Sequence, residues 1–113
     1  MLGKIFELGS LLKQAHEFGG KVQEMNDKLR LLRVKGIAGG GMVDVEVNGL
    51  KEMVACHIEH TLIEQQDNEL IEDLVVAATN DAIEQSRIKQ AESMRSLTEG
   101  IDLGALTEVI KKN

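Results

Sequence analysis

A short strand pattern between two long helical patterns constrains the fold of this chain most strongly. In residues 39–49, GGGMVDVEVNG, three valines (Val43, Val45 and Val47) occupy every second position. A period of two predicts a strand with one buried face. Three glycines precede this strand and an Asn-Gly pair, a signal for a tight hairpin turn, follows it. A small β-meander therefore interrupts an otherwise helical chain.

The residues before this meander have the repeat of a long amphipathic helix. Apolar side chains recur at alternating steps of three and four residues: Leu8, Leu11, Ala15, Phe18, Val22, Met25, Leu29 and Leu32. This heptad pattern predicts a helix over residues 4–32, roughly 40–45 Å long at 1.5 Å per residue. Gly19 and Gly20 interrupt the pattern without shifting its phase. We therefore expect a soft point in the helix and not its end.

The rest of the chain divides into two further strands, a second long helix and a tail. Residues 33–38 and 51–59 are predicted to flank the central strand at 42–47. The second helix is expected to begin after a cap at Asp67 or Asn68 and to run to about Leu97. The predicted fold is α+β, α-β-β-β-α, with a three-stranded antiparallel meander between two long helices. Residues 1–97 form the domain, and residues 98–113 a C-terminal tail in which 105–112 could form a short amphipathic helix.

The predicted core lacks large aromatic side chains and is small. The chain has 113 residues, two phenylalanines and no Trp or Tyr, so its core is built from aliphatic residues and oligomerisation would help to stabilise it. The apolar stripe of the first helix also needs a partner to cover it. We therefore predict a homodimer, whose dimer and core contacts come from Leu8, Leu11, Phe18, Val22, Met25, Leu29 and Leu74.

Cysteine usage and hydropathy indicate a cytoplasmic protein without a membrane partner. Cys56 is the single cysteine, which excludes an internal disulfide framework and fits a reducing compartment. No apolar run approaches the roughly 18–20 residues that span a bilayer. Lys4 is soon followed by Glu7 and polar residues, so we expect no signal peptide.

Charge is distributed unevenly along the sequence. The net charge is −6, which by itself argues against a nucleic-acid partner. Residues 42–86 hold one basic residue and eleven acidic ones. Residues 1–41 hold seven basic residues against four acidic ones, and residues 87–113 hold five against four. Basic side chains on the outer helices can still contact phosphate locally, although the long-range field does not assist them.

Two other patterns are considered as sites and set aside. Cys56, His57, His60 and Glu64 are potential metal ligands, but neighbouring strand residues point to opposite faces and no Cys-x-x-Cys pair is present. The glycines at 39–41 precede a strand and not a helix, so they predict a turn and not a phosphate loop. No nucleophile and base occur at a recognisable spacing. We predict no enzyme activity, metal, cofactor or small-molecule substrate.

Four blocks of sequence carry a resemblance to a known family. They are Leu8-Gly9 with Lys13-Gln14-Ala15, Val34-Lys35-Gly36, Gly41-Met42-Val43 through Val47-Asn48-Gly49, and Glu72-Asp73-Leu74 through Asn80-Asp81-Ala82. In this order they resemble the YbaB/EbfC family of small bacterial nucleoid-associated proteins, over about residues 1–97. The chain departs from the family at Phe18-Gly19-Gly20, at Glu59-His60 and in its tail.

The resemblance implies a tweezers-like homodimer that binds duplex DNA in the nucleoid. The basic residues expected to contact phosphates are Lys13, Lys21, Lys28, Arg30 and Arg33 on the first helix, followed by Arg87, Lys89 and Arg95 on the second. The sequence has no helix-turn-helix spacing and no aromatic stacking residues, so little sequence preference is expected. A homodimeric scaffold or adaptor for a protein partner is the alternative, which the acidic net charge favours. Ordinary surface charge explains the same basic residues if the resemblance is left aside.

Overall fold

The structure, a computed structural model, describes residues 2–99 of the chain. Its elements are α1 (Leu2–Leu31), β1 (Val34–Ala38), a 3₁₀ turn (Gly39–Gly41), β2 (Val43–Val47), β3 (Met53–Ile58), the short helix α2 (His60–Glu64) and α3 (Asn68–Glu99). The predicted α-β-β-β-α order is confirmed, with α2 as an addition. The expected tail helix at residues 105–112 lies outside the described residues.

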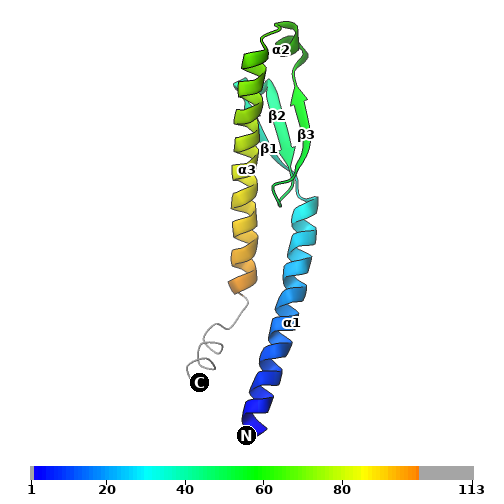
Figure 1. Ribbon diagram of the computed structural model, residues 1–113, viewed down its shortest axis with the longest axis vertical. Coiled ribbons are helices and arrows are strands. Elements are labelled where there is room, and N and C mark those ends of the chain that lie inside the picture. Colours follow the sequence, from blue (N-terminus) through cyan, green and yellow to red (C-terminus); the bar gives the residue numbers. More distant parts are fainter. Residues whose placement is uncertain (1, 100–113) are drawn as a thin grey trace.

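The molecule is long and narrow, with its sheet at one end and its helices projecting from it. Its extents are 76 × 22 × 17 Å. The first half of α3 lies against the sheet, and its second half continues beyond the sheet beside α1 (Figure 1). α1 begins past the end of α3, so the chain forms an arm of two helices that narrows to one.

The sheet is a simple antiparallel meander in the order β1-β2-β3. Val45 at its centre pairs with Gly36 on β1 and with Cys56 on β3. The turn between β1 and β2 requires its glycines, because Gly39, Gly40 and Gly41 have φ values of 61°, 66° and 94°. Side chains are strained in this left-handed region, which explains why three glycines precede the central strand.

The core lies between one face of the sheet and α3. Val43, Val45 and Val47 are buried, together with Leu62 of α2 and with Ala78 and Ala82 of α3. Gly36 permits the close approach of α3, because a Cβ there would collide with the backbone at Ala78 and Ala82. Leu74 packs against this cluster as a partly buried residue.

The turn between β2 and β3 is longer than the tight Asn-Gly turn that the sequence suggested. β3 begins at Met53, and Lys51, not Gly49, takes the left-handed conformation with φ 67°. The buried side chain of Asn48 organises the loop: its Oδ1 accepts the backbone N–H groups of Leu50 and Glu52 at 2.9 and 3.1 Å. An Asn that bonds its own following backbone can close a longer loop than a two-residue turn.

The same loop ties the two long helices to the sheet. Ser86 of α3, fully buried, donates its hydroxyl to the Asn48 carbonyl at 2.8 Å. The N–H of Gly49 donates to the Leu29 carbonyl of α1 at 2.7 Å, and a Cβ at Gly49 would lie 2.8 Å from that same oxygen. The turn therefore sets where the arm leaves the sheet.

α1 is one uninterrupted helix through its paired glycines, as the sequence predicted. A Cβ at Gly19 or Gly20 would meet no atom within 4 Å. The apolar residues of α1 that were predicted to make dimer and core contacts differ in how far they are buried within one chain. Leu29 is buried, Leu11, Phe18, Val22 and Met25 are half-buried, and Leu8 is exposed.

β3 forms an open edge of the sheet. α3 packs mainly on β1 and β2, and all residues from Met53 to His57 are exposed. The edge at β1 is different, because the Ile37 N–H donates to Asp81 of α3 at 3.1 Å. One edge of the sheet is thus covered by α3, and the other carries apolar side chains into solvent.

Candidate nucleic-acid interface

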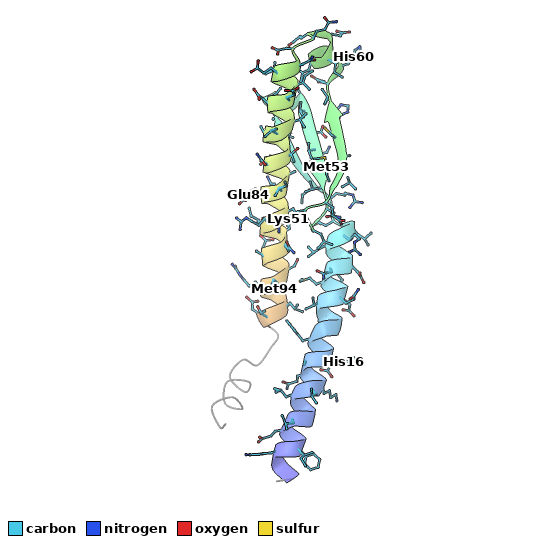
Figure 2. The ribbon with its side chains drawn as sticks, viewed as in Figure 1. His16, Lys51, Met53, His60, Glu84 and Met94 are labelled. Atoms are coloured by element: carbon cyan, nitrogen blue, oxygen red, sulfur yellow. The ribbon has the colours of Figure 1, made fainter. Side chains whose placement is uncertain are left out.

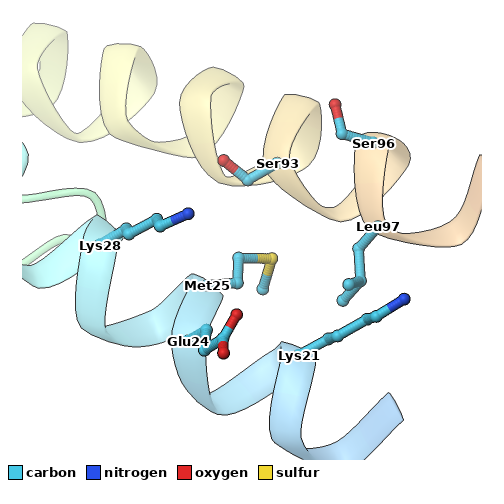
Figure 3. Close-up of a pocket in the computed structure, with 7 residues that line it drawn as sticks. All are labelled: Lys21, Glu24, Met25, Lys28, Ser93, Ser96 and Leu97. Carbon is cyan, nitrogen blue, oxygen red and sulfur yellow. The ribbon is translucent and has the colours of Figure 1, made fainter. Parts of the chain in front are cut away.

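A groove runs between α1 and the second half of α3 (Figure 3). Its volume is about 410 Å³, and it is lined by Lys21, Glu24, Met25 and Lys28 of α1 and by Ser93, Ser96 and Leu97 of α3. Met25 and Leu97 supply its apolar surface, and Ser93 and Ser96 line it from the opposite helix. The groove combines two cations with hydroxyl donors, the side chains that bind phosphate oxygens in protein–DNA complexes.

Lys21 and Lys28 lie on the same side of α1 because they are seven residues, about two turns, apart. Their ammonium groups are therefore spaced at about 10 Å along the groove. Both side chains are exposed, and neither forms a salt bridge with another residue in the 2–99 segment. These two cations are available to an anionic ligand.

The other basic residues predicted on the first helix do not join this pair, and Arg33 lies beyond the end of α1 at Leu31. Arg30 is about 200° around the helix from Lys28 at 100° per residue, and its guanidinium lies 3.9 Å from a Glu52 carboxylate oxygen. Arg33 donates to the Arg30 and Leu32 carbonyls at 2.9 and 3.0 Å, which caps the end of α1. Lys13 is about 80° around the helix from Lys21 and about 12 Å nearer the N-terminus.

Two of the three predicted cations on α3 are engaged locally. Arg87 Nε donates to Glu84 at 3.0 Å, and Lys89 lies 3.7 Å from Glu92. The hydrogen bond from Arg87 holds the pKa of the Glu84 carboxyl below its ordinary value and raises the pKa of Arg87. Arg95 is exposed and has no salt-bridge partner among the described residues.

The inward-facing side of α3 along the groove was not found from the sequence. Ser86, Gln90, Ser93 and Leu97 recur at steps of four, three and four residues and are all at least half-buried. The larger apolar residues on this part of α3, Ile88 and Met94, are 44% and 40% exposed. The missed residues carry a heptad spacing, but three of the four are polar and hydropathy does not reveal them.

Negative charge is concentrated at the opposite end of the molecule. The eleven acidic residues of segment 42–86 lie on the sheet, on α2, on the first part of α3 and, for Glu52, Glu59 and Asp67, in the connections between these elements. The groove lies on the arm, where acidic and basic residues are nearly balanced. Electrostatic repulsion of a polyanion is therefore strongest at the sheet and weakest along the arm.

The two patterns set aside in the sequence, the potential metal ligands near Cys56 and the glycines at 39–41, do not form a ligand site among the described residues. His60 Nε2 lies 3.1 Å from Glu64, one turn apart on α2, and no three potential metal ligands gather anywhere in residues 2–99. The glycines at 39–41 form the strand turn described above. Of the helices that the structure describes, none is long and apolar enough to cross a membrane.

Comparison with known proteins places the chain in a family. The model of the YbaB/EbfC DNA-binding family matches residues 4–101, nearly the whole chain. The chain belongs to the YbaB/EbfC DNA-binding family. The solved structure of the uncharacterised protein HP0035 from Helicobacter pylori shares its fold, with a TM-score of 0.60 and 32% identity over 77% of this chain and 91% of that one.

Two bacterial proteins align with this chain over nearly their whole length. The nucleoid-associated protein DP1429 of Desulfotalea psychrophila is 38% identical over 104 residues, 92% of this chain and 98% of the relative. The nucleoid-associated protein GbCGDNIH1_0260 of Granulibacter bethesdensis is 40% identical over 98 residues, 87% of this chain and 92% of the relative. The family resemblance inferred from the sequence is confirmed.

Proposed function

We propose that this YbaB/EbfC chain is a bacterial nucleoid-associated protein that binds duplex DNA as a homodimer, with little sequence preference. The observation that carries the proposal is the pairing of Lys21 and Lys28 along a groove that Ser93 and Ser96 also line. Each lysine neutralises one phosphate, and the serine hydroxyls donate to phosphate oxygens. Such contacts hold a protein on the duplex but carry little sequence information.

The charge distribution determines how the duplex approaches. The acidic sheet end repels the phosphate backbone, while the arm presents Lys13, Lys21, Lys28 and Arg95, which form no salt bridge with any residue that the structure describes. DNA therefore lies along the α1–α3 arms and away from the sheet. Arg30, Arg33, Arg87 and Lys89 contribute less, because each is engaged within the protein. At physiological salt the field is screened within about 8 Å, so these contacts act at close range.

The open edge at β3 supports a second copy as the partner for dimerisation. Met53 and Val54 are 52% and 48% exposed on this strand. An exposed apolar edge strand invites pairing with another strand or covering by another surface. Met53 and Cys56 lie on the α3 side of the sheet, because they pair with Val47 and Val45 of β2.

The adjacent flank of α3 extends this apolar surface. Asp81 faces β1 through its bond to Ile37, and Ile83 lies about 200° around the helix from Asp81. Val76, two turns before Ile83, lies on the same flank, and the two are 59% and 37% exposed. A second protomer packed on β3 and this flank buries both surfaces and brings two arms together as a pair.

We further propose that the protein works in the cytoplasm on the nucleoid, without a cofactor or a catalytic step. Its role is to occupy DNA, and the dimer presents two groove sites to one duplex. The names of the two bacterial relatives and the family description support this assignment.

A DNA titration of the purified protein tests the proposal. Two duplexes of unrelated sequence are each titrated at about 50 mM and at about 200 mM salt, the range over which phosphate contacts weaken strongly. We expect similar affinities for both duplexes and at least about a hundredfold loss at the higher salt, since Lys21 and Lys28 alone supply four phosphate contacts per dimer. Failure to bind either duplex at the lower salt would exclude DNA as the partner and leave the protein-adaptor function in its place.

A further inference from the structure

The loop between β2 and β3 holds Lys51 in a backbone conformation that few lysines adopt. Its φ is 67°, in the left-handed region where glycine and asparagine are the usual residues. A side chain in this region is strained, and the strain persists only where the surrounding structure holds the residue in place. Residues strained in this way are concentrated at active sites and ligand clamps. A lysine at a position where glycine would relieve the strain indicates that its side chain is used.

Two hydrogen bonds anchor Lys51 on α3. Its backbone N–H donates to the hydroxyl of Ser86 at 3.2 Å, and its Nζ donates to Gln90 Oε1 at 2.9 Å. Ser86 is fully buried and donates in turn to the Asn48 carbonyl at 2.8 Å. Both the backbone and the ammonium group of Lys51 are therefore fixed to the helix that forms one wall of the groove.

The bond to Gln90 orders the ammonium group of Lys51 without neutralising it. Gln90 contributes an uncharged amide oxygen, and the exposed Lys51 forms no salt bridge within the described part of the chain. The adjacent carboxylate of Glu52 accepts a hydrogen bond from Asn48 at 2.8 Å and lies 3.9 Å from the guanidinium of Arg30. An anion that binds an ammonium group already held in position loses less side-chain entropy than one that has to order it.

Lys51 lies at the end of the groove nearest the sheet. Figure 2 shows it at a level between Glu84 and Met94 of α3, where the arm leaves the sheet. Its partner Gln90 precedes the groove residue Ser93 by about one turn of α3, and both are half-buried on the inward-facing side of that helix. The ammonium group is thus bound about one turn before the part of α3 that lines the groove.

The same loop also reaches the other wall of the groove. The Gly49 N–H donates to the Leu29 carbonyl at 2.7 Å, and Leu29 directly follows the groove residue Lys28 on α1. One loop therefore bonds to both helices of the groove at its sheet end. Lys51 is the single basic residue of segment 42–86, so it is the one cation that this acidic segment brings to the groove.

We propose that Lys51 binds a DNA phosphate at the sheet end of the groove and makes, with Lys21 and Lys28, the third phosphate contact of each protomer. The inference rests on the proposed DNA-binding function and deepens it, because it sets the inner limit of the bound duplex at the β2–β3 loop. The ammonium group has three N–H donors. One of them stays on Gln90, and the others are directed to phosphate oxygens.

Salt-dependent binding of duplex DNA by the full-length chain tests this contact. Lys51→Gln removes the charge, Lys51→Arg keeps it, and the control Lys35→Gln removes the same charge from an exposed position on β1. Lys51→Gln loses two phosphate contacts per dimer, so its slope of log affinity against log salt should fall in magnitude by about 1.8, at roughly 0.9 per phosphate. Lys51→Arg and Lys35→Gln should each change the slope by less than about 0.9, one phosphate contact.

A fourth variant, Lys51→Gly, separates binding from folding. Glycine relieves the strain of the positive φ, so the midpoint of urea denaturation should be maintained or raised. Its DNA binding should nevertheless weaken as that of Lys51→Gln does. Loss of binding without loss of stability is the result expected of a phosphate contact, whereas a residue that only supports the loop would lose both together.

The outcomes distinguish this contact from the proposed function. If the unmodified protein binds duplex DNA and Lys51→Gln keeps its slope, or if Lys35→Gln lowers the slope equally, the Lys51 contact is overturned and the proposed function stands. If the unmodified protein binds no duplex at low salt, the proposed function fails and the Lys51 contact fails with it.

Discussion

Single residues determine how closely the elements of this protein approach one another. Gly36 lets α3 lie on the sheet, and Asn48 with Ser86 fixes the loop from which both long helices leave. The sequence marked Asn48 as a turn residue but not as a buried one, because its role depends on Ser86, 38 residues away. Gly36 was singled out by family resemblance alone, since close approach of a backbone leaves no trace in hydropathy.

Replacing Gly36 by alanine tests the close approach of α3. The added Cβ would collide with the backbone at Ala78 and Ala82, so the helix has to move away from the sheet. We expect a loss of about 1–3 kcal/mol or more in the free energy of unfolding, measured by urea denaturation. The control is Gly40→Ala, which adds the same methyl group where no atom lies within 4 Å; its effect reflects only the strain of the positive φ. An unchanged stability of Gly36→Ala would contradict the described packing.

Replacing both Gly19 and Gly20 by alanine tests the soft point in α1. Both residues are helical, and a Cβ at either meets nothing within 4 Å. Alanine favours the helix by about 1 kcal/mol per glycine replaced, so stability should rise by about 1–2 kcal/mol. Thermal unfolding followed by circular dichroism measures the change. A clear loss of stability would indicate that the glycines provide a close contact in the assembled protein.

At the scale of elements, hydrophobic periodicity predicted which segments are helices and strands but not which of their faces are covered. The heptad stripe of α1 is real, yet within one chain it is buried only near Leu29 and exposed at Leu8. Likewise β3 has the alternation of a strand and is exposed on both faces. Periodicity identifies an apolar face of a helix or strand. Which residues pack on that face depends on elements distant in sequence or on another molecule.

The exposed edge strand leads to a prediction about assembly. Val54→Lys places a charge in the proposed dimer surface, so the dimer should dissociate to a chain of 12.4 kDa at micromolar concentration. Sedimentation velocity measures this shift. The matched control is Ile37→Lys, a comparably exposed apolar residue on β1, at 57% against 48%; it should leave the dimer intact. Dissociation by both substitutions, or by the control alone, would contradict an interface at β3.

For the whole molecule, the proposed function depends on the separation of an acidic sheet end from an arm whose groove lysines have no salt bridge within residues 2–99. From the sequence, the basic residues could be assigned only to two helices, because a linear count does not show which of them form salt bridges. The structure separates Lys21 and Lys28, which line the groove, from Arg30, Arg33, Arg87 and Lys89, which are engaged within the chain. The groove itself could not be predicted, since Ser93 and Ser96 contribute to it through packing alone.

The central claim, that paired lysines in the groove hold DNA by its phosphates, is tested most directly by salt dependence. The affinity of the double variant Lys21→Glu and Lys28→Glu for duplex DNA is measured against salt, beside the control Arg30→Glu and Lys35→Glu, which has the same charge change outside the groove. The groove variant loses four phosphate contacts per dimer, so its log–log slope should fall in magnitude by about 3–4, at roughly 0.9 per phosphate. The control should keep a slope within about 1 of the unmodified protein. Equal slopes for the two double variants would contradict the account.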